Sequence, residues 1–291
     1  MKILITGAGG FIGGCLTEAF CKEGHQVVAL CRKNKPRIPA EGSNQISIIH
    51  DISKNIKDLP PVDVIIHTAA HTHLIQNSSA NDYVQANVIG MLNLVDYAIN
   101  NRPKIFINFS TISIYGEIAV GELNEDTPLN KPGMYGLSKY MAEQILKTAK
   151  DSFPAVTIRL PGVVGKGYYT PWLGKVLNKC LEHKPITIYN ANSLFNNVVD
   201  LLEIKKFISQ LINFRVNGYE YVNLAATEPI TISEVITRIV ATAKSRSSIK
   251  KEQTAKTSFS ISTEKLAGIF GYRPAKTATM IERYVKENLP D

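Results

Sequence analysis

The sequence predicts an α/β protein built on a doubly wound parallel sheet, with a smaller lobe interleaved toward the C-terminus. Three observations support this fold class. Short apolar runs alternate with amphipathic stretches of helical period through the first half of the chain. A glycine-rich turn joins the first apolar run to the first helical stretch. Past residue 160, prolines and glycines interrupt the alternation, which indicates a second lobe.

The expected elements of the first half follow in chain order. Several runs rich in Val, Ile and Leu are too short for helices and apolar on both faces, as buried parallel strands are. These strands are expected at Lys2–Thr6, Gln26–Cys31, Ile46–His50, Val62–His67, Lys104–Phe109 and Ala155–Leu160. Between them, helical periodicity predicts helices at Phe11–Lys22, Ala80–Asn100 and Tyr135–Lys150.

The remaining elements follow the change of rhythm after residue 160. Helices are predicted at Trp172–Glu182, Leu202–Asn213, Ile232–Ala243 and Thr277–Asn288, and a strand at Pro185–Tyr189. The Lys- and Ser-rich run 244–256 is expected to be a solvated loop, because it lacks the interleaved aromatics of a nucleic-acid patch. We expect one domain to comprise residues 1–160 and 194–222, and the second lobe to comprise residues 161–193 and 223–291.

Composition and cysteine spacing argue against a zinc-binding, disulfide-stabilised or membrane-spanning protein. The 291 residues are 44% hydrophobic and 20% charged, as in ordinary globular proteins. A formal net charge of +8 suits an anionic ligand. The four cysteines lack the paired spacing of a zinc site or disulfide framework, so reduced thiols are expected. The chain begins with a strand and contains no apolar run of membrane-spanning length, so we expect a cytoplasmic protein.

The glycine-rich turn carries the motif TGAGGFIG between the first strand and the first helix. Gly7 would permit the tight turn, Gly10 would let the backbone approach a pyrophosphate, and Gly13 would allow close contact between helix and strand. The amides that open the helix, at Phe11 and Ile12, would face the anion. The motif therefore predicts a Rossmann-type, dinucleotide-binding sheet.

Residues at the ends of the next two strands bear on the choice of dinucleotide. Arg32 and Lys33 follow the second strand, where an acidic residue would bind the ribose of NAD and a basic one would accommodate the 2′-phosphate of NADP. The sequence thus favours NADP over NAD, unless both charges are merely solvated. After the third strand, Asp51 either accepts a hydrogen bond from the adenine or forms a turn before Ile52.

Tyr135 and Lys139 are four residues apart in a predicted helix. This spacing puts both side chains on one helix face, one turn apart. An ammonium beside a phenol favours the phenolate, so the tyrosine could exchange a proton near neutral pH.

Together, these motifs resemble those of the extended short-chain dehydrogenase/reductases, the group of NAD(P)-dependent nucleotide-sugar epimerases, dehydratases and reductases. The resemblance covers essentially the whole chain. Its motifs are the glycine loop, HTAA at 67–70, NVIG at 87–90, STISIYG at 110–116, the Tyr135–Lys139 pair and GYRP at 271–274.

The resemblance implies a role for each matching residue. Thr111 would hydrogen-bond the sugar oxygen that becomes a carbonyl, Tyr135 would be the acid and base on that oxygen, and Lys139 would hold the nicotinamide ribose. Further cofactor contacts are implied for His67, Ala69, Ala70, Asn87 and Pro161, and substrate contacts for Ser113, Gly162, Tyr168 and Arg273.

The chain also departs from the family pattern. Ile112 and Ser113 stand where dehydratases of the group carry Asp-Glu, so elimination is not expected. Gly162 replaces an Asn near the substrate diphosphate of many members, and residues 194–200 lack the usual Arg. Diphosphate binding would then use Lys166, Lys175 or Arg273, and a substrate that is not a nucleotide stays open.

The remaining groups of reactive residues give weaker support to other functions. His67, His71 and His73 lack an acidic or thiol residue at ligand spacing, so no metal site is expected. No Gly-x-Ser-x-Gly elbow surrounds Ser110, which argues against a hydrolase. The aromatic side chains of Tyr168, Tyr169 and Trp172 would either stack on a base or sugar or pack between the two lobes.

We therefore predict reversible hydride transfer at a sugar carbon, most simply C4, by a nucleotide-sugar 4-ketoreductase. The alternatives are a 4-epimerase, a ketoreductase of a non-nucleotide substrate, and a non-catalytic dinucleotide-binding module. The resemblance implies a homodimer formed through the helices near the Tyr–Lys pair. Neither nucleic acid nor a membrane is an expected partner.

Overall fold

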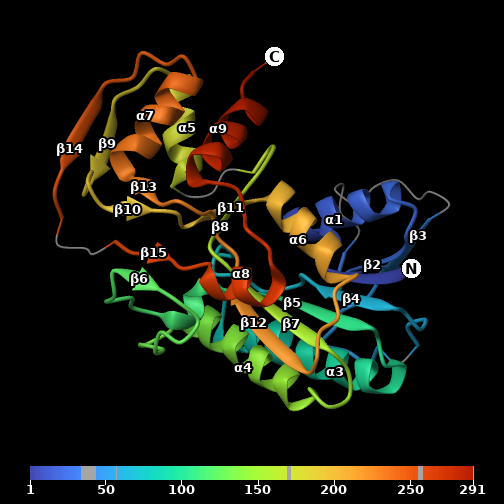
Figure 1. Ribbon diagram of the computed structural model, residues 1–291. Coiled ribbons are helices and arrows are strands. Elements are labelled where there is room, and N and C mark those ends of the chain that lie inside the picture. The colour runs from blue at the N-terminus through green and yellow to red at the C-terminus, as the bar shows by residue number, and fades with distance from the viewer. Residues whose placement is uncertain (34–43, 57, 169–171, 255–257, 291) are drawn as a thin grey trace. The chain divides into compact units, whose positions relative to one another are not determined.

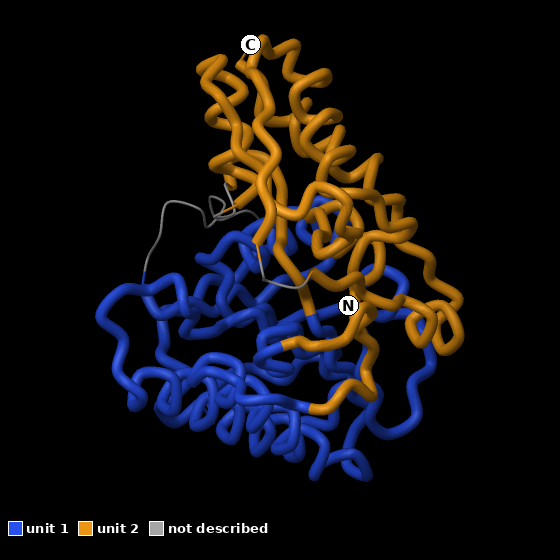
Figure 2. The backbone as a smooth tube through the Cα atoms, turned by 90° about the vertical axis from the view of Figure 1, so that its left-hand side faces the viewer, with its two compact units in different colours: residues 1–117, 129–159, 208–222 blue, residues 118–128, 160–207, 223–291 orange. Residues whose placement is uncertain are grey.

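The computed structural model describes residues 1–33, 44–56, 58–168, 172–254 and 258–290. The chain divides into two compact units, coloured separately in Figure 2. Unit 1 comprises Met1–Glu117, Leu129–Arg159 and Ile208–Val222, and unit 2 comprises Ile118–Pro128, Leu160–Phe207 and Asn223–Asp291. Figure 1 shows the elements of each unit.

Unit 1 is built on a seven-stranded sheet of order β12-β7-β5-β4-β1-β2-β3. Its strands are β1 (Lys2–Thr6), β2 (Gln26–Cys31), β3 (Gln45–Ile49), β4 (Val64–His67), β5 (Ile105–Thr111), β7 (Ala155–Leu160) and β12 (Tyr219–Asn223). The register is parallel from β3 through β2, β1 and β4 to β5. The strand order reverses between β1 and β4, which is where doubly wound sheets bind ligands. The predicted fold class is confirmed.

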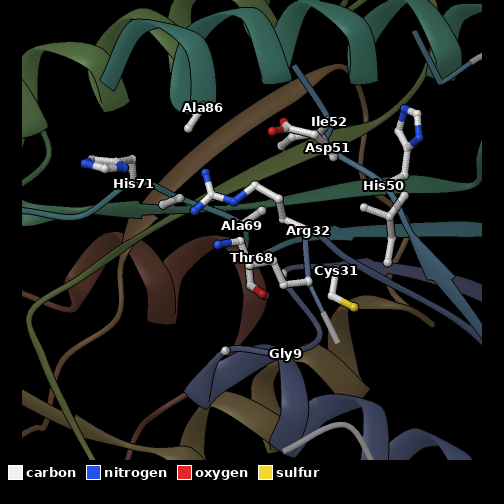
Figure 3. Close-up of a pocket in the computed structure, with 15 residues that line it drawn as sticks. Gly9, Cys31, Arg32, His50, Asp51, Ile52, Thr68, Ala69, His71 and Ala86 are labelled. Carbon is white, nitrogen blue, oxygen red and sulfur yellow. The ribbon is translucent and has the colours of Figure 1, made fainter. Parts of the chain in front are cut away.

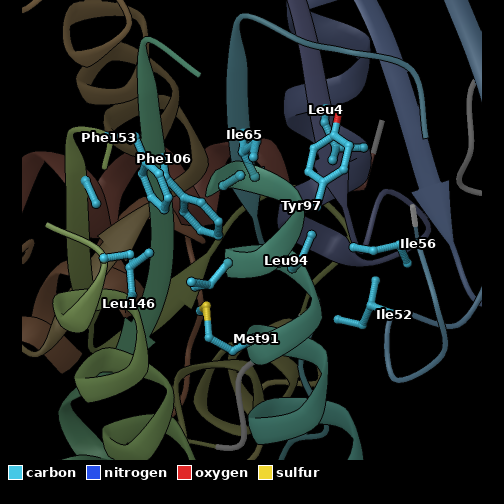
Figure 4. Close-up of a cluster of buried hydrophobic side chains, with 14 of the residues drawn as sticks. Leu4, Ile52, Ile56, Ile65, Met91, Leu94, Tyr97, Phe106, Leu146 and Phe153 are labelled. Carbon is cyan, nitrogen blue, oxygen red and sulfur yellow. The ribbon is translucent and has the colours of Figure 1, made fainter. Parts of the chain in front are cut away.

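Helices cover both faces of this sheet (Figure 1). Helix α1 (Phe11–Lys22) lies on one face, while α3 (Gly90–Asn101) and α4 (Met134–Thr148) lie on the other. Figure 4 shows the core between the sheet and α3 and α4. There, the fully buried Leu94 and Leu146 meet strand residues such as Ile65. Burying such aliphatic side chains contributes ~1.5–3 kcal/mol each, which fixes α4 against the sheet.

The stretch predicted as one helix at Ala80–Asn100 has three parts. A short helix, α2 (Ala80–Tyr83), begins at a capping box of Ser79 and Asp82. A π-helical segment, Val84–Ile89, follows and leads into α3. Sequence periodicity missed the π-helical segment because its wider turn does not change the pattern of apolar residues over so few positions.

Unit 2 contains four small two-stranded sheets and a core of its own. The pairs are β8 (Gly162–Val164) with β11 (Val198–Asp200), β9 (Ile186–Tyr189) with β14 (Ile249–Glu252), β10 (Leu194–Phe195) with β13 (Ile230–Thr231), and β6 (Glu122–Leu123) with β15 (Ser260–Ile261). Its helices are α5 (Leu173–Leu181), α7 (Ile232–Thr242), α8 (Glu264–Phe270) and α9 (Thr277–Glu287), and α6 (Leu201–Leu211) leads back into unit 1.

Two sequence-based expectations differ from this arrangement. Residues 118–128 and 194–207 group with unit 2 rather than with the sheet domain, because β6, β10 and β11 pair with strands of unit 2. The run 244–256 is not a loop throughout: β14 lies within it and pairs in parallel with β9. Ile249 explains this strand, since it packs against the core of unit 2 despite its lysine neighbours. Among the described residues, no helix is long and apolar enough to span a membrane.

Candidate functional site

The glycine loop occupies the turn between β1 and α1. A Cβ atom on Gly13 would lie 2.3 Å from the carbonyl oxygen of Gly7 and 2.6 Å from Thr68 Oγ1, so only glycine allows the helix to approach this closely. No side chain caps the start of α1 at Gly10. The amides at Phe11 and Ile12 therefore open a helix N-terminus suited to a phosphate.

A cavity of about 180 Å³ lies beside this loop, at the carboxyl ends of β1 to β4 (Figure 3). Its size would enclose only part of a dinucleotide, because small-molecule pockets usually exceed ~300 Å³. Of the predicted cofactor residues, those lining it are Gly7, Gly10, Arg32, Lys33, Asp51, Ile52, Ala69 and Ala70. His71, Cys31 and His50 also line it and were not among the predicted cofactor contacts.

Charged side chains stand at the β2–β3 end of this cavity. Arg32 extends into it in Figure 3, with Asp51 on the neighbouring strand end. Burial raises the pKa of Asp51, but hydrogen bonds from Ser53 and the charges of Arg32 and Lys54 outweigh burial and lower it overall. Asp51 is therefore a carboxylate near neutral pH, and this end of the cavity holds both an anion and a cation.

Several predicted cofactor residues do not line the cavity, namely Phe11, Ile12, Gly13, His67, Asn87, Tyr135, Lys139 and Pro161. His67 is fully buried, and its Nδ1 shares a 2.7 Å hydrogen bond with Thr6 Oγ1. The Asn87 side chain binds the backbone of His71 through both its oxygen (2.8 Å) and its nitrogen (3.0 Å). The same nitrogen donates to Ser138 Oγ on α4 at 2.9 Å. In this structure, Asn87 ties the loop after β4 to the helix that carries the Tyr–Lys pair.

The proposed catalytic residues come together from β5 and α4 within unit 1. Thr111 ends β5, and its Oγ1 accepts a hydrogen bond from the amide of Ser113 at 3.1 Å. A Cβ atom on Gly136 would lie 2.1 Å from the carbonyl oxygen of Ser113, so α4 packs directly against the turn after Thr111. The ring of Tyr135 lies 5.3 Å from that of His73.

Lys139 lies one turn beyond Tyr135 on α4 and is buried. Burial lowers its pKa to about 8, even though the carboxylate of Glu143 acts in the opposite direction. Lys139 therefore stays protonated at neutral pH, although its buried environment disfavours the charged form. Such a group favours a nearby anion, and the phenolate of Tyr135 would be one.

The remaining predicted site residues lie in unit 2. Pro161 lies between β7 and β8, and Gly162 begins β8. The amide of Tyr168 donates to the carbonyl of Gly165 at 3.2 Å, and Arg273 follows α8 on the surface. Tyr169 lies outside the described residues. None of these residues lines the larger cavity of unit 2, which has a volume of about 570 Å³.

Trp172 lines this larger cavity, whereas Tyr168, the other described residue of the predicted aromatic cluster, does not. Its ring packs edge-on against Phe195 with the centroids 5.0 Å apart. The other lining residues are Thr187, Ile188, Tyr189, Asn190, Ile232, Thr254 and Ser258. Sequence reasoning missed them, although the alternation of buried and exposed residues in β9 signals a strand with one open face.

The three histidines of the sequence motif do not converge. Nε2 of His71 hydrogen-bonds Ser78 Oγ at 2.7 Å, whereas His67 binds Thr6 and His73 packs on Tyr135. No group of three or more His, Cys, Asp or Glu side chains in the described part of the chain is arranged to hold a metal ion.

The chain belongs to the NAD dependent epimerase/dehydratase family, whose sequence profile matches residues 3–209. This confirms the family predicted from the motifs, and the chain is accordingly an enzyme of that family. It is 27% identical over 258 residues to the uncharacterized UDP-glucose epimerase YtcB of Bacillus subtilis, covering 82% of this chain and 81% of that one.

Two further comparisons frame the possible chemistry. The chain is 36% identical over 172 residues to a 2-alkyl-3-oxoalkanoate reductase of Stenotrophomonas maltophilia, a match covering 56% of this chain and 51% of that protein. Its fold matches UDP-glucuronic acid 4-epimerase from Bacillus cereus in complex with NAD, with a TM-score of 0.82 and 22% identity over 99% of this chain and 98% of that one. At that identity, the likeness shows the fold alone.

The burial of Lys139 predicts that removing its charge stabilises the protein. Its pKa is about 8 in the folded chain against an ordinary value of 10.5, so the unfolded chain binds the proton more tightly. Stability should rise with pH between these values, and below pH 8 the buried charge costs folding energy. We expect Lys139→Met to raise the free energy of unfolding at pH 7 by about 2 kcal/mol.

Urea unfolding of wild type and variant at pH 7 and pH 10 measures this effect. Lys147→Met on the exposed side of the same helix is the control and should leave stability unchanged. If Lys139→Met had the same stability and pH dependence as wild type, the prediction that the buried Lys139 charge destabilises the fold would be wrong.

Proposed function

We propose that this enzyme is an NADP-preferring oxidoreductase that transfers hydride at C4 of a nucleotide-diphosphate sugar, as a 4-ketoreductase. The single observation that carries the proposal is the buried Lys139 ammonium one turn from Tyr135, on a helix packed against the turn after Thr111. Membership of the epimerase/dehydratase family and the glycine loop at the start of α1 support a nicotinamide cofactor.

The residues present fit a dinucleotide. The uncapped start of α1 and the close packing at Gly13 provide a phosphate cradle, and Arg32 and Lys33 provide positive charge at the far end of the cavity. When bound, the nicotinamide would supply or accept the hydride. Lys139 would hold its ribose through the ammonium group.

The proton steps are assigned to this chain's own residues. Thr111 Oγ1 would hydrogen-bond the substrate oxygen and orient it toward Tyr135. In the reduction direction, the Tyr135 hydroxyl would give its proton to the oxygen of the carbonyl as that carbon becomes an alcohol. Lys139 would stabilise the phenolate left behind, and solvent would return the proton.

A 4-epimerase is the second candidate. The names of YtcB and of the structural neighbour favour it, and the same Thr–Tyr–Lys set would serve both reactions. The two functions differ in whether the cofactor leaves in a changed redox state. The basic pair Arg32 and Lys33 favours the reductase, because net reduction commonly draws on NADPH.

A ketoreductase of a non-nucleotide substrate is also supported by one specific observation. The chain shares 36% identity over 172 residues with the 2-alkyl-3-oxoalkanoate reductase. The absence of the family's Asn and Arg at the diphosphate positions agrees with such a substrate. We nevertheless assign a nucleotide sugar, since unit 2 offers a large cavity with Trp172 and Tyr189 for stacking and hydroxyl side chains for a sugar.

We further propose that the protein is a homodimer formed through α3 and α4. Both helices pack on the same face of the unit 1 sheet, yet they expose large apolar side chains. These are Leu92 and Ile99 on α3, and Met134, Leu137 and Met141 on α4. Two copies of such a face can pack about a two-fold axis.

The catalytic assignment predicts that Tyr135→Phe lowers kcat at least ~10³-fold, because general acid–base catalysis by one group contributes ~10²–10⁴-fold. The dissociation constant of NADPH should change less than about threefold. Steady-state turnover over a panel of nucleotide 4-keto sugars and nucleotide sugars measures kcat, and fluorescence titration measures binding. Tyr140→Phe on the same helix is the control, and turnover of Tyr135→Phe within tenfold of wild type would contradict the mechanism.

The cofactor assignment predicts that wild type binds NADPH more tightly than NADH. Arg32→Ala should weaken NADPH binding roughly 10–100-fold and NADH binding less than about threefold, because a charge-assisted hydrogen bond to phosphate contributes ~1.5–3 kcal/mol. Lys54, which does not line the cavity, provides the control variant Lys54→Ala. Tighter binding of NADH by wild type, with tightly bound NAD in the purified protein, would instead support the epimerase.

The dimer assignment predicts that Leu137→Asp converts the protein to a folded monomer. Leu137 is 40% exposed, so the carboxylate remains solvated in the monomer but would be buried in the interface. Sedimentation velocity measures the change. Leu194→Asp, at an exposed position in unit 2, should remain dimeric, and a monomeric wild type would overturn the assignment.

A further inference from the structure

A buried ion pair involves the face of α4 that carries Tyr135 and Lys139, one turn farther along the helix. Glu143 is fully buried and Arg159 of β7 is 5% exposed. Arg159 Nη2 donates to Glu143 Oε2 at 2.8 Å, and its Nε lies 3.2 Å from both carboxylate oxygens. The geometry is bidentate, which orients both side chains as well as neutralising them.

This ion pair joins the elements that carry the proposed catalytic residues. Glu143 lies one turn beyond Lys139 on α4. Its Oε1 accepts a hydrogen bond from Ser110, the residue before Thr111 at the end of β5. Arg159 Nη1 donates to the hydroxyl of Tyr115, in the turn after Thr111, at 2.7 Å. One carboxylate therefore connects the helix of Lys139 to the strand of Thr111.

The charges in this interior do not balance. Within the part of the chain that the structure describes, two buried cations, Lys139 and Arg159, lie near one buried carboxylate, that of Glu143. His67 of β4 adds no positive charge, because burial and then the charge of Lys139 hold its pKa well below the ordinary range. The other titratable groups that face the pair are the phenols Tyr115, Tyr219 and Tyr221.

We propose that Glu143 is a positioning residue for catalysis: it keeps Lys139 protonated and fixes Thr111 relative to Tyr135. Arg159 limits this effect, because its positive charge offsets most of the negative charge of the carboxylate. One positive charge in this interior therefore stays uncompensated. The phenolate of Tyr135 would supply the missing anion. The inference deepens the proposed function and rests on it for the role of Tyr135.

A merely structural role explains the arrangement less well. A buried ion pair seldom stabilises a fold more than apolar side chains of the same volume, because desolvation of the charges offsets their attraction. The surrounding core already holds α4 through Leu146 and Ala142. The position of the pair, one turn from Lys139 and one residue from Thr111, points to electrostatic control of the site.

The charge-removing variant Glu143→Gln tests the proposal with two measurements. The midpoint of the Lys139 titration, observed by NMR of ¹³C-labelled lysine and assigned by its absence in Lys139→Met, should move below the wild-type value of about 8. In turnover, kcat at pH 7 should fall at least tenfold, with a smaller loss at pH 6, while KM changes less than about threefold. Turnover should recover toward low pH because protons replace the missing stabilisation of the ammonium.

Arg159→Met provides a test of opposite sign. Without the competing cation, Glu143 acts on Lys139 alone, so the lysine midpoint should move above that of wild type. This result keeps the proposal testable if Glu143→Gln fails to fold. Ser110→Ala removes a hydrogen bond but no charge and should leave the midpoint unchanged. Glu282→Gln, in an exposed ion pair with Arg238, should change neither the midpoint nor turnover.

The outcomes separate the two proposals. If Glu143→Gln and Arg159→Met lower stability without moving the Lys139 midpoint, the ion pair is structural and the inference is overturned. The NMR titration needs no substrate, so it is independent of the reaction assignment. Full turnover by Tyr135→Phe would overturn the proposed function while leaving the lysine titration result intact.

Discussion

The hydrogen bonds of Thr6 join the two strands on which the site depends. Its hydroxyl shares a hydrogen bond with His67 at the end of β4, and its carbonyl accepts one from Thr68 Oγ1 at 2.7 Å. These bonds hold β1 and β4 together at their carboxyl ends, where the strand order of the sheet reverses. The glycine loop follows Thr6 directly, and the loop after β4 lines the same cavity. Because β1 and β4 are parallel, both loops lie at the carboxyl ends of the strands, and the hydrogen bonds of Thr6 fix the distance between them.

The same edge is connected to the catalytic helix through Asn87. Its amide holds the backbone of His71 and reaches Ser138, which lies between Tyr135 and Lys139. Ser138 in turn donates to the carbonyl of Tyr135 at 2.9 Å. The π-helical segment that contains Asn87 is thus a physical link between the cavity beside the glycine loop and the Tyr–Lys pair. Its irregular backbone is of a kind often found next to functional sites, which agrees with the proposed site.

The sequence predicted most of the structural features that depend on the spacing of residues along the chain. The strands of the first half, the glycine loop and the Tyr135–Lys139 pair are all recognised from periods of two, four or a few residues, and the structure has them within a residue or two at the ends. It missed β14 and β12, which are strands because of distant partners rather than apolar composition. A run of lysines with one partly buried isoleucine carries no local signal for a strand.

The sequence was least informative about buried charge. Glu143 follows Lys139 at helical spacing, and Arg159 interrupts an apolar strand, but neither fact shows that the two meet. Their pairing depends on the crossing of α4 over β7, which is a property of the tertiary fold. The same holds for the lowered pKa of Lys139, because burial cannot be read from an i, i+4 pattern. A spacing rule identifies the reactive groups, whereas tertiary packing sets their charge.

The division of the chain into two units puts all the proposed catalytic residues in one of them. Thr111, Tyr135, Lys139 and the glycine loop belong to unit 1, so the proposed hydride and proton transfer would depend on that unit. The cavity of unit 2 is lined by Trp172, Thr187 and Asn190, which carry no acid or base. These side chains can select a ligand by stacking and hydrogen bonding but cannot change the reaction. The proposed reductase and the alternative epimerase would therefore need the same residues of unit 1, because both reactions use the Thr111, Tyr135 and Lys139 set.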